Sequence, residues 1–166
     1  AMPDWRAYGL LCFNINLQGG SPEGYSKDQP WHNSALMEDG TLRPDYMNRL
    51  EKIMDRADEL GMVVNLGVFY FGQDQRLLSE SAIIKALDNT IDWIINHQYQ
   101  HVLLEINNEC NIRYSHRILQ PERVHELISH VIARTEGARR LLVSTSYGGG
   151  TVAKSNVVRI ADYILM

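Results

Sequence analysis

A glutamate stands at the end of a short apolar segment in the middle of the chain. Residues 101–111 read HVLLEINNECN, and the apolar run stops at Asn108 and Glu109. In parallel α/β sheets, catalytic and binding groups gather at the carboxyl ends of the strands, because the loops there vary while the strands hold them in place. We therefore predict a strand that delivers Glu109 to a functional site. An isolated Asn-Glu pair also fits a simple cap on whatever follows the strand, so the rest of the chain must decide.

A second carboxylate, Glu105, lies in the same predicted strand, and the two-residue period of a strand shows which face each side chain takes. This period places Glu105 and Glu109 on one face and Asn108 on the other. We expect Glu105 to be a buried structural group held by hydrogen bonds or a cation, because charges inside proteins need partners. Asn108 and Glu109 can reach one ligand only if the strand end twists or bulges.

Strand and helix patterns alternate along the chain. The hydrophobic periodicity predicts strands at about 8–16, 62–71, 101–108, 141–146 and 163–166, helices at about 44–60, 79–95 and 121–136, a loop at 18–40 and a short helical turn at 155. Ser79 or Ser81 is expected to cap the second helix, Pro121 to open the third, and Ser155 to cap the short turn. Strands that alternate with helices indicate parallel pairing with right-handed crossovers.

Two architectures fit this order, an open doubly wound sheet and part of a (β/α)₈ barrel. The open sheet calls for a phosphate-binding loop after its first strand, and QGGS at 18–21 matches neither of the usual glycine patterns. GGG at 148–150 lacks the lysine, and we interpret it as a loop. A whole barrel takes about 250 residues. We therefore predict an α/β fold, a partial barrel of about five parallel strands, in a single domain over residues 1–166.

Composition narrows the classes of partner. The net charge is −4, with 22% charged and 45% hydrophobic residues, which gives no electrostatic footprint for nucleic acid. No apolar run reaches the ~20 residues of a membrane span. Two cysteines give no disulfide framework, and six histidines include no HExxH pattern, so we expect neither a metal site nor a cofactor. The compartment stays open.

The segment ending INNECN resembles the Asn-Glu signature on the fourth barrel strand of the clan A glycoside hydrolases, which include the family 5 cellulases. NLQGGSP at 16–22, FYFGQD at 69–74 and STSYGGG at 144–150 resemble other strand ends of a cellulase-like group in that clan. The resemblance implies that the predicted strands correspond to the second to sixth strands of the family. It also implies hydrolysis of β-glycosidic bonds in oligo- or polysaccharides.

By this resemblance, Glu109 is the general acid/base and Asn108 bonds the sugar 2-hydroxyl. A glycosidic oxygen leaves poorly until it is protonated, so the assigned role is chemically sound. The family nucleophile lies on the seventh strand, which has no counterpart here. Asp74, near a strand rim, and Asp162, at a strand entrance, are the other acids near strand termini, and neither takes the nucleophile position. We therefore expect a fragment that is inactive alone.

Side chains near the other strand ends are expected to bind the sugar. Trp31 has polar neighbours suited to hydroxyl groups, and Tyr70, Gln73 and Tyr147 follow predicted strands. Each aromatic ring also fits ordinary core packing.

Two alternatives remain open. The first is a non-catalytic carbohydrate-binding or oligomeric half-barrel. The second is an open-sheet enzyme of another class, although the chain has neither a GxSxG elbow nor a P-loop. A partial barrel has two open edges, at 8–16 and 163–166, so we expect a homodimer that joins through them.

Overall fold

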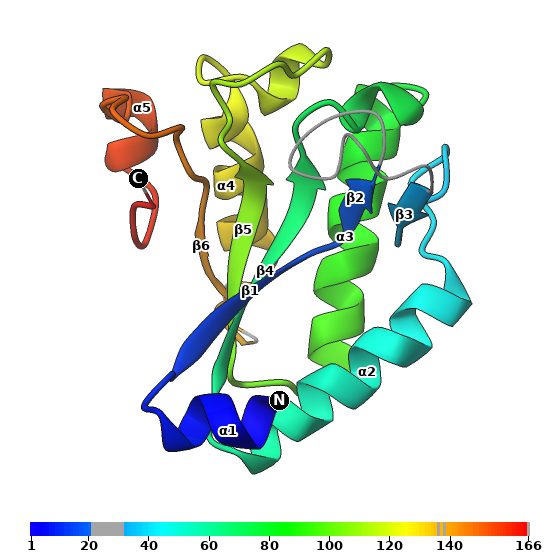
Figure 1. The fold of residues 1–166 in the computed structure, drawn as a ribbon. Coiled ribbons are helices and arrows are strands. Elements are labelled where there is room, and N and C mark those ends of the chain that lie inside the picture. The colour runs from blue at the N-terminus through cyan, green and yellow to red at the C-terminus, as the bar shows by residue number, and fades with distance from the viewer. Residues whose placement is uncertain (21–31, 136, 138, 166) are drawn as a thin grey trace.

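The computed structural model describes residues 1–20, 32–135, 137 and 139–165. Four parallel strands form its central sheet, in the order β1 (Cys12–Asn16), β4 (Val63–Tyr70), β5 (Val102–Asn108) and β6 (Leu142–Ser144) (Figure 1). Strands that follow one another through the helical crossovers are neighbours in the sheet, as they are in a (β/α)₈ barrel. The α/β class and the partial barrel-like sheet are therefore confirmed.

The sheet has four strands rather than five. The segment predicted as a fifth strand forms one isolated bridge, between Leu165 and Ser146, two residues beyond the end of β6. Just before it, Asp162 accepts a hydrogen bond from the Val143 N–H at 2.8 Å and binds the Arg140 guanidinium at 2.7 Å. Two backbone bonds, from the Asp162 N–H to the Val143 carbonyl at 3.0 Å and from the Tyr147 N–H to the Leu165 carbonyl at 3.1 Å, and the Asp162 side chain thus hold the segment without forming a strand ladder.

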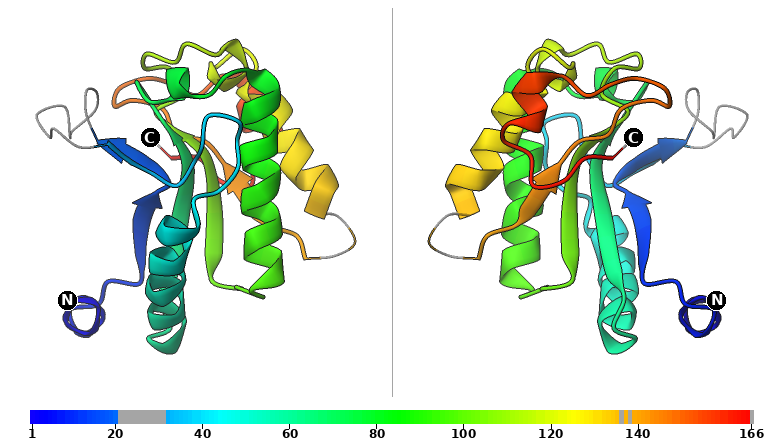
Figure 2. Two further views of the ribbon diagram at one scale, coloured as in Figure 1. Left: turned by 90° about the vertical axis from the view of Figure 1, so that its right-hand side faces the viewer. Right: turned by 90° about the vertical axis from the view of Figure 1, so that its left-hand side faces the viewer.

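Three long helices cover one face of the sheet, as the two views in Figure 2 show. They are α2 (Pro44–Glu59), α3 (Glu80–Asn96) and α4 (Val124–Thr135). The Ser79 hydroxyl caps α3 by accepting from the Ala82 N–H at 3.2 Å, as predicted. Pro121 stands three residues before α4 rather than in its first turn. No helix in the described ranges is long and apolar enough to cross a membrane.

The predicted first strand is four residues too long at its start. Residues Met2–Ala7 form a short helix, α1, and Gly9 turns the chain with φ +90° before β1 begins. The predicted loop at 18–40 contains a small antiparallel hairpin of β2 (Gln18–Gly20) and β3 (His32–Ser34). Short connections include the 3₁₀ turns η2 (Asp74–Arg76) and η3 (Arg117–Leu119) and the helix α5 (Ser155–Val158). Lys154 is the N-cap of α5, so the predicted cap at Ser155 is wrong.

The two faces of the sheet differ in composition. The face toward the helices is apolar and fully buried, with Val64, Leu66, Val68, Leu104 and Ile106 packed against the helices. On the opposite face, the register aligns Asn16, Gly67, Glu105 and Ser144 in one row across all four strands. The next row contains Asn14, Asn65, Leu103 and Leu142, and Leu142 is 47% exposed. This polar inner face is where the candidate site lies.

Candidate active site

Glu109 directly follows β5, at the carboxyl end of the sheet. Asn108 is the last residue of the strand, and Glu109 takes a left-handed backbone conformation with φ +50°. That conformation interrupts the strict alternation of side chains, because the chain leaves the extended region at this residue. Both side chains are half-buried. Strained backbone at a non-glycine residue is common at functional sites.

Hydrogen bonds from the end of β6 and from the following turn fix this position. The Glu109 N–H donates to the Ser146 hydroxyl at 2.7 Å, and the Cys110 N–H donates to the Ser146 carbonyl at 2.9 Å. The Tyr114 hydroxyl donates to the Asn108 carbonyl at 2.6 Å. Because neighbouring segments hold the backbone on both sides, the strand end is a rigid platform for the Glu109 carboxyl group.

The Asn108 side chain has unused hydrogen-bonding capacity. Its amide oxygen is buried and has no hydrogen-bond partner among the residues that the structure describes. Buried polar atoms without partners are rare in proteins, and each one calls for an explanation such as a ligand or water. This oxygen is therefore suited to accept a bond from a ligand hydroxyl beside Glu109.

Glu105 lies inside the sheet, as expected, and is 1% exposed. The Asn65 amide donates to its Oε2 at 3.1 Å, while its Oε1 has no partner in the described part of the chain. Gly67, its neighbour in the row, leaves space for the Asn16 side chain, since a Cβ there would clash with Asn16 Oδ1 but would lie at ordinary contact distance, 3.6 Å, from Glu105 Oε2. Burial raises the pKa of the Glu105 carboxyl above its ordinary value, and the charge of Glu109 adds to the rise. The Ser146 and Asn65 side chains oppose it.

We expect Glu105→Gln to stabilise the protein at neutral pH. A carboxyl whose pKa is higher in the folded state binds its proton more tightly there. The stability that the Glu105 carboxyl group contributes is complete below the pKa of the unfolded state, about 4.3, and is lost as the pH rises through the pKa of the folded state. Glutamine resembles the neutral acid, so the gain should grow between pH 4 and pH 8. Urea unfolding at several pH values measures this, and an equal effect at both ends of the range would contradict it.

Neither of the other two acids considered from the sequence stands free beside Glu109. Asp74 is fully buried, and its Oδ2 accepts from the N–H groups of Ser115 and His116, each at 2.8 Å. It therefore ties the loop after β4 to the loop after β5, and burial raises its pKa. Asp162 lies at the amino end of β6, bonded to Arg140 and the Val143 N–H.

The residues predicted to bind sugar are more buried than such a role suggests. Tyr70 is 7% exposed, and its ring stacks on Phe71 with centroids 4.5 Å apart. Gln73 is fully buried, and its side-chain oxygen accepts from Arg76 Nε at 3.1 Å. Tyr147 is 2% exposed, and its hydroxyl accepts from the Lys154 N–H at 3.2 Å. Trp31 lies outside the described residues, and all four roles stay predictions.

Sequence reasoning missed the residues that hold the site together. Ser146 and Tyr114 contact Glu109 and Asn108 directly, and Gln18 accepts from the Tyr70 N–H at 3.1 Å. The polar run that ends the β6 segment was the available signal for Ser146. Within the described ranges, no three His, Cys, Asp or Glu side chains lie where they could share a metal ion.

Comparison with solved structures shows similarity to an endoglucanase. No protein-family model and no curated protein matches the chain. A solved GH5-4 broad specificity endoglucanase from an uncultured bovine rumen ciliate superimposes with a TM-score of 0.59 and 16% identity. The match covers 86% of this chain and 38% of that enzyme. At this level of identity the comparison shows a shared cellulase-like fold, and the chain spans well under half of the enzyme.

Proposed function

We propose that this chain is a segment of a glycoside hydrolase barrel that binds β-linked oligo- or polysaccharides at the carboxyl end of β5. The observation that carries the proposal is the strained, rigidly held Glu109 next to the unused amide oxygen of Asn108. The fold shared with an endoglucanase supports it.

The proposed chemistry uses Glu109 as general acid/base. Its carboxyl group would protonate the glycosidic oxygen as the bond breaks, while Asn108 holds the sugar 2-hydroxyl. Hydrolysis also needs a second carboxylate, about 5–5.5 Å away for retention or about 6.5–9.5 Å away for inversion. Glu105 is buried, Asp74 ties two loops together, and Asp162 lies at the other end of the sheet. We therefore propose binding without turnover by this chain.

Binding of cellotetraose, a neutral β-linked probe, tests the site. We expect Asn108→Ala to weaken binding by about tenfold, the equivalent of one hydrogen bond of about 1.4 kcal/mol. Asn48→Ala, an exposed position on α2, is the matched control and should leave the affinity unchanged. Calorimetric titration gives both values. Equal affinities for wild type and Asn108→Ala would remove the basis of the proposed site.

An aryl β-glycoside assay tests the missing step. We expect no turnover above background, because one positioned carboxylate cannot both protonate the leaving group and activate a nucleophile. Ordinary glycosidase rates that Glu109→Gln abolishes would mean that another acid completes the site. That result would favour a full enzyme over the non-catalytic carbohydrate-binding half-barrel. The half-barrel is favoured here because the Asp74 carboxylate is already bonded to the N–H groups of Ser115 and His116.

We also propose that the chain forms a homodimer through its open sheet. β1 pairs only with β4, so its other edge is free in the described structure. Leu11 and Leu142, 56% and 47% exposed, add apolar surface near the two edge strands. Open edges and apolar patches favour association. Light scattering should give about twice the 19.0 kDa of one chain.

Leu142→Asp should shift the particle to the monomer, since it places a charge on the uncovered face. Val152→Asp, at a residue that is 84% exposed, is the control and should leave the dimer intact. A monomer for the unmodified chain at micromolar concentration would contradict the proposal.

A further inference from the structure

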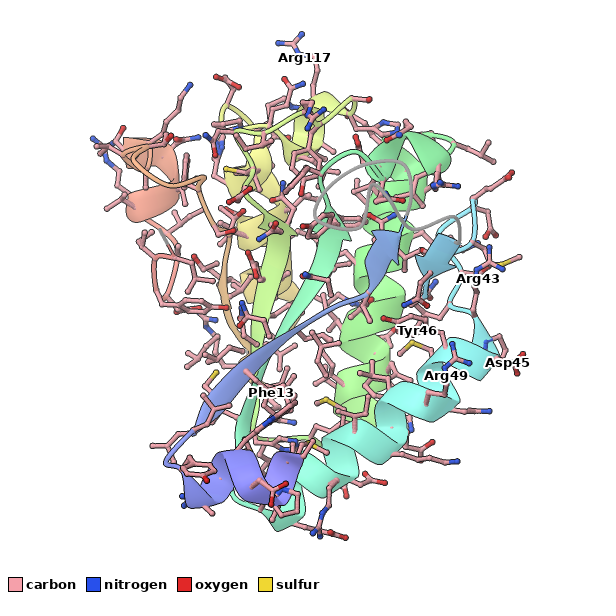
Figure 3. The ribbon with its side chains drawn as sticks, in the orientation of Figure 1. Phe13, Arg43, Asp45, Tyr46, Arg49 and Arg117 are labelled. Atoms are coloured by element: carbon pink, nitrogen blue, oxygen red, sulfur yellow. The ribbon has the colours of Figure 1, made fainter. Side chains whose placement is uncertain are left out.

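A separate hollow lies between β3 and the first turns of α2. Its volume is about 580 Å³, and it is lined by Asn33, Ser34, Met37, Arg43, Pro44, Asp45, Tyr46 and Arg49. This size is within the range of small-molecule sites. A second hollow of about 200 Å³ shares Asn33, Tyr46 and Arg49 and continues toward Ile15 and Leu50. Figure 3 shows the labelled side chains of Arg43, just before α2, and of Asp45, Tyr46 and Arg49 in the first turns of the helix.

Arg43 and Arg49 bring two positive charges to this hollow. Neither forms an ion pair with a carboxylate in the part of the chain that the structure describes. The arginines at 56, 123, 134 and 140 each pair with one, at 2.5–2.9 Å. Among the described residues, the guanidinium groups of Arg43 and Arg49 thus lack a carboxylate partner, which suits them to a negatively charged ligand.

Tyr46 makes one wall of the hollow rigid. Its hydroxyl donates to the Asn16 carbonyl at 2.8 Å, which anchors the ring to the last residue of β1. The Arg49 guanidinium lies over the ring, 5.5 Å from its centroid, in a cation–π contact. An aromatic face beside a held guanidinium loses little conformational entropy when a ligand binds.

We propose that this hollow, here called the arginine pocket (Asn33, Arg43, Tyr46 and Arg49), binds an acidic sugar unit of a polysaccharide. The inference rests on the proposed carbohydrate function and narrows its substrate class to chains that carry uronic acid. Guanidinium groups bind a carboxylate through two parallel hydrogen bonds, and the exposed Asn33 amide suits a sugar hydroxyl. Asp45 on the same rim adds one negative charge, which favours a ligand with one carboxylate per sugar over a compact polyanion.

Titration with β-1,4-linked tetraglucuronate, cellotetraose and sodium sulfate tests the arginine pocket. We expect tetraglucuronate, which carries a carboxylate on each sugar of the same β-linked chain, to bind with an affinity that falls as salt is added, because ions screen exposed charges. Arg43→Gln and Arg49→Gln should each weaken this binding by about tenfold and leave cellotetraose binding unchanged. Lys52→Gln, which removes the same charge from an exposed position outside the pocket, should have no effect.

Amide chemical shifts in the same titrations separate the two sites. Tetraglucuronate should shift the amides of Arg43 and of residues 45–50, whereas cellotetraose should shift those of residues 108–114. Tetraglucuronate binding that survives the double Arg43→Gln, Arg49→Gln variant would overturn the arginine pocket. Sulfate binding as tight as that of tetraglucuronate would also overturn it, since the site would then recognise an anion without its sugar. Failure of cellotetraose alone to bind would speak only against the site at β5.

Discussion

Gly40→Ala is expected to lower the free energy of unfolding by about 3 kcal/mol or more. Gly40 has φ +86°, which costs other residues about 1–2 kcal/mol. A Cβ there would lie 2.2 Å from the Ala82 carbonyl oxygen and 2.9 Å from the Ala86 nitrogen, both in the backbone of α3. Overpacking of this kind costs about 1–3 kcal/mol more. Urea unfolding measures the sum.

Substitutions at two other glycines separate the backbone cost of a positive φ from the cost of overpacking. Gly9 has φ +90° and no atom within 4 Å of an added Cβ, so Gly9→Ala reports the backbone cost alone. Gly149 has open space as well and no positive φ, so Gly149→Ala should change stability by less than about 0.5 kcal/mol. If Gly40→Ala cost no more than Gly9→Ala, the turn at Gly40 would not be pressed against α3.

The helices and their order could be predicted because their signals are local. The cap at Ser79 and the apolar period that follows it specify α3 within a few residues. Pro44 and Gly61 frame α2 in the same way, the latter with φ +62°. Buried apolar runs then locate the parallel strands. Periodicity and capping thus predicted most of the fold.

The errors concern elements that depend on distant contacts. Residues 163–166 have strand-like composition, yet the chain is fastened there by Asp162 to Arg140 and Val143. Residues 2–7 form α1, although the apolar stretch after it reads as one long strand. In neither case does the local sequence carry the information that decides the outcome.

The same distinction applies to the candidate site. The strand end at Glu109 followed from one local pattern. Its support by Ser146 joins residues 37 positions apart, and the arginine pocket joins Asn33 to Arg49 across a helix start. The burial of Gln73 and Tyr147 also depends on how two loops pack. Sequence patterns locate side chains along an element, whereas pockets and supporting bonds depend on how elements meet.

Glu109→Gly is expected to raise the stability of the protein while weakening its binding of sugar. The left-handed backbone at Glu109 costs a non-glycine residue about 1–2 kcal/mol, and glycine avoids this cost. The gain is reduced by about 0.5–1 kcal/mol, because glycine loses more conformational freedom when the chain folds. The net gain should be about 0.5–1 kcal/mol in urea unfolding. Cellotetraose binding should fall by about tenfold, as expected for the loss of one charged hydrogen-bonding group.

Gln98 provides the matched control, because it has φ +58° just after α3 and precedes the amino end of β5, whereas Glu109 follows the carboxyl end. Gln98→Gly should give a similar gain in stability and leave cellotetraose binding unchanged. A gain at both positions with a loss of binding only at Glu109 indicates that strain is kept at Glu109 for its carboxyl group. If Glu109→Gly were destabilising instead, the carboxyl group would be a structural contact, and the acid/base proposal would lose its main support.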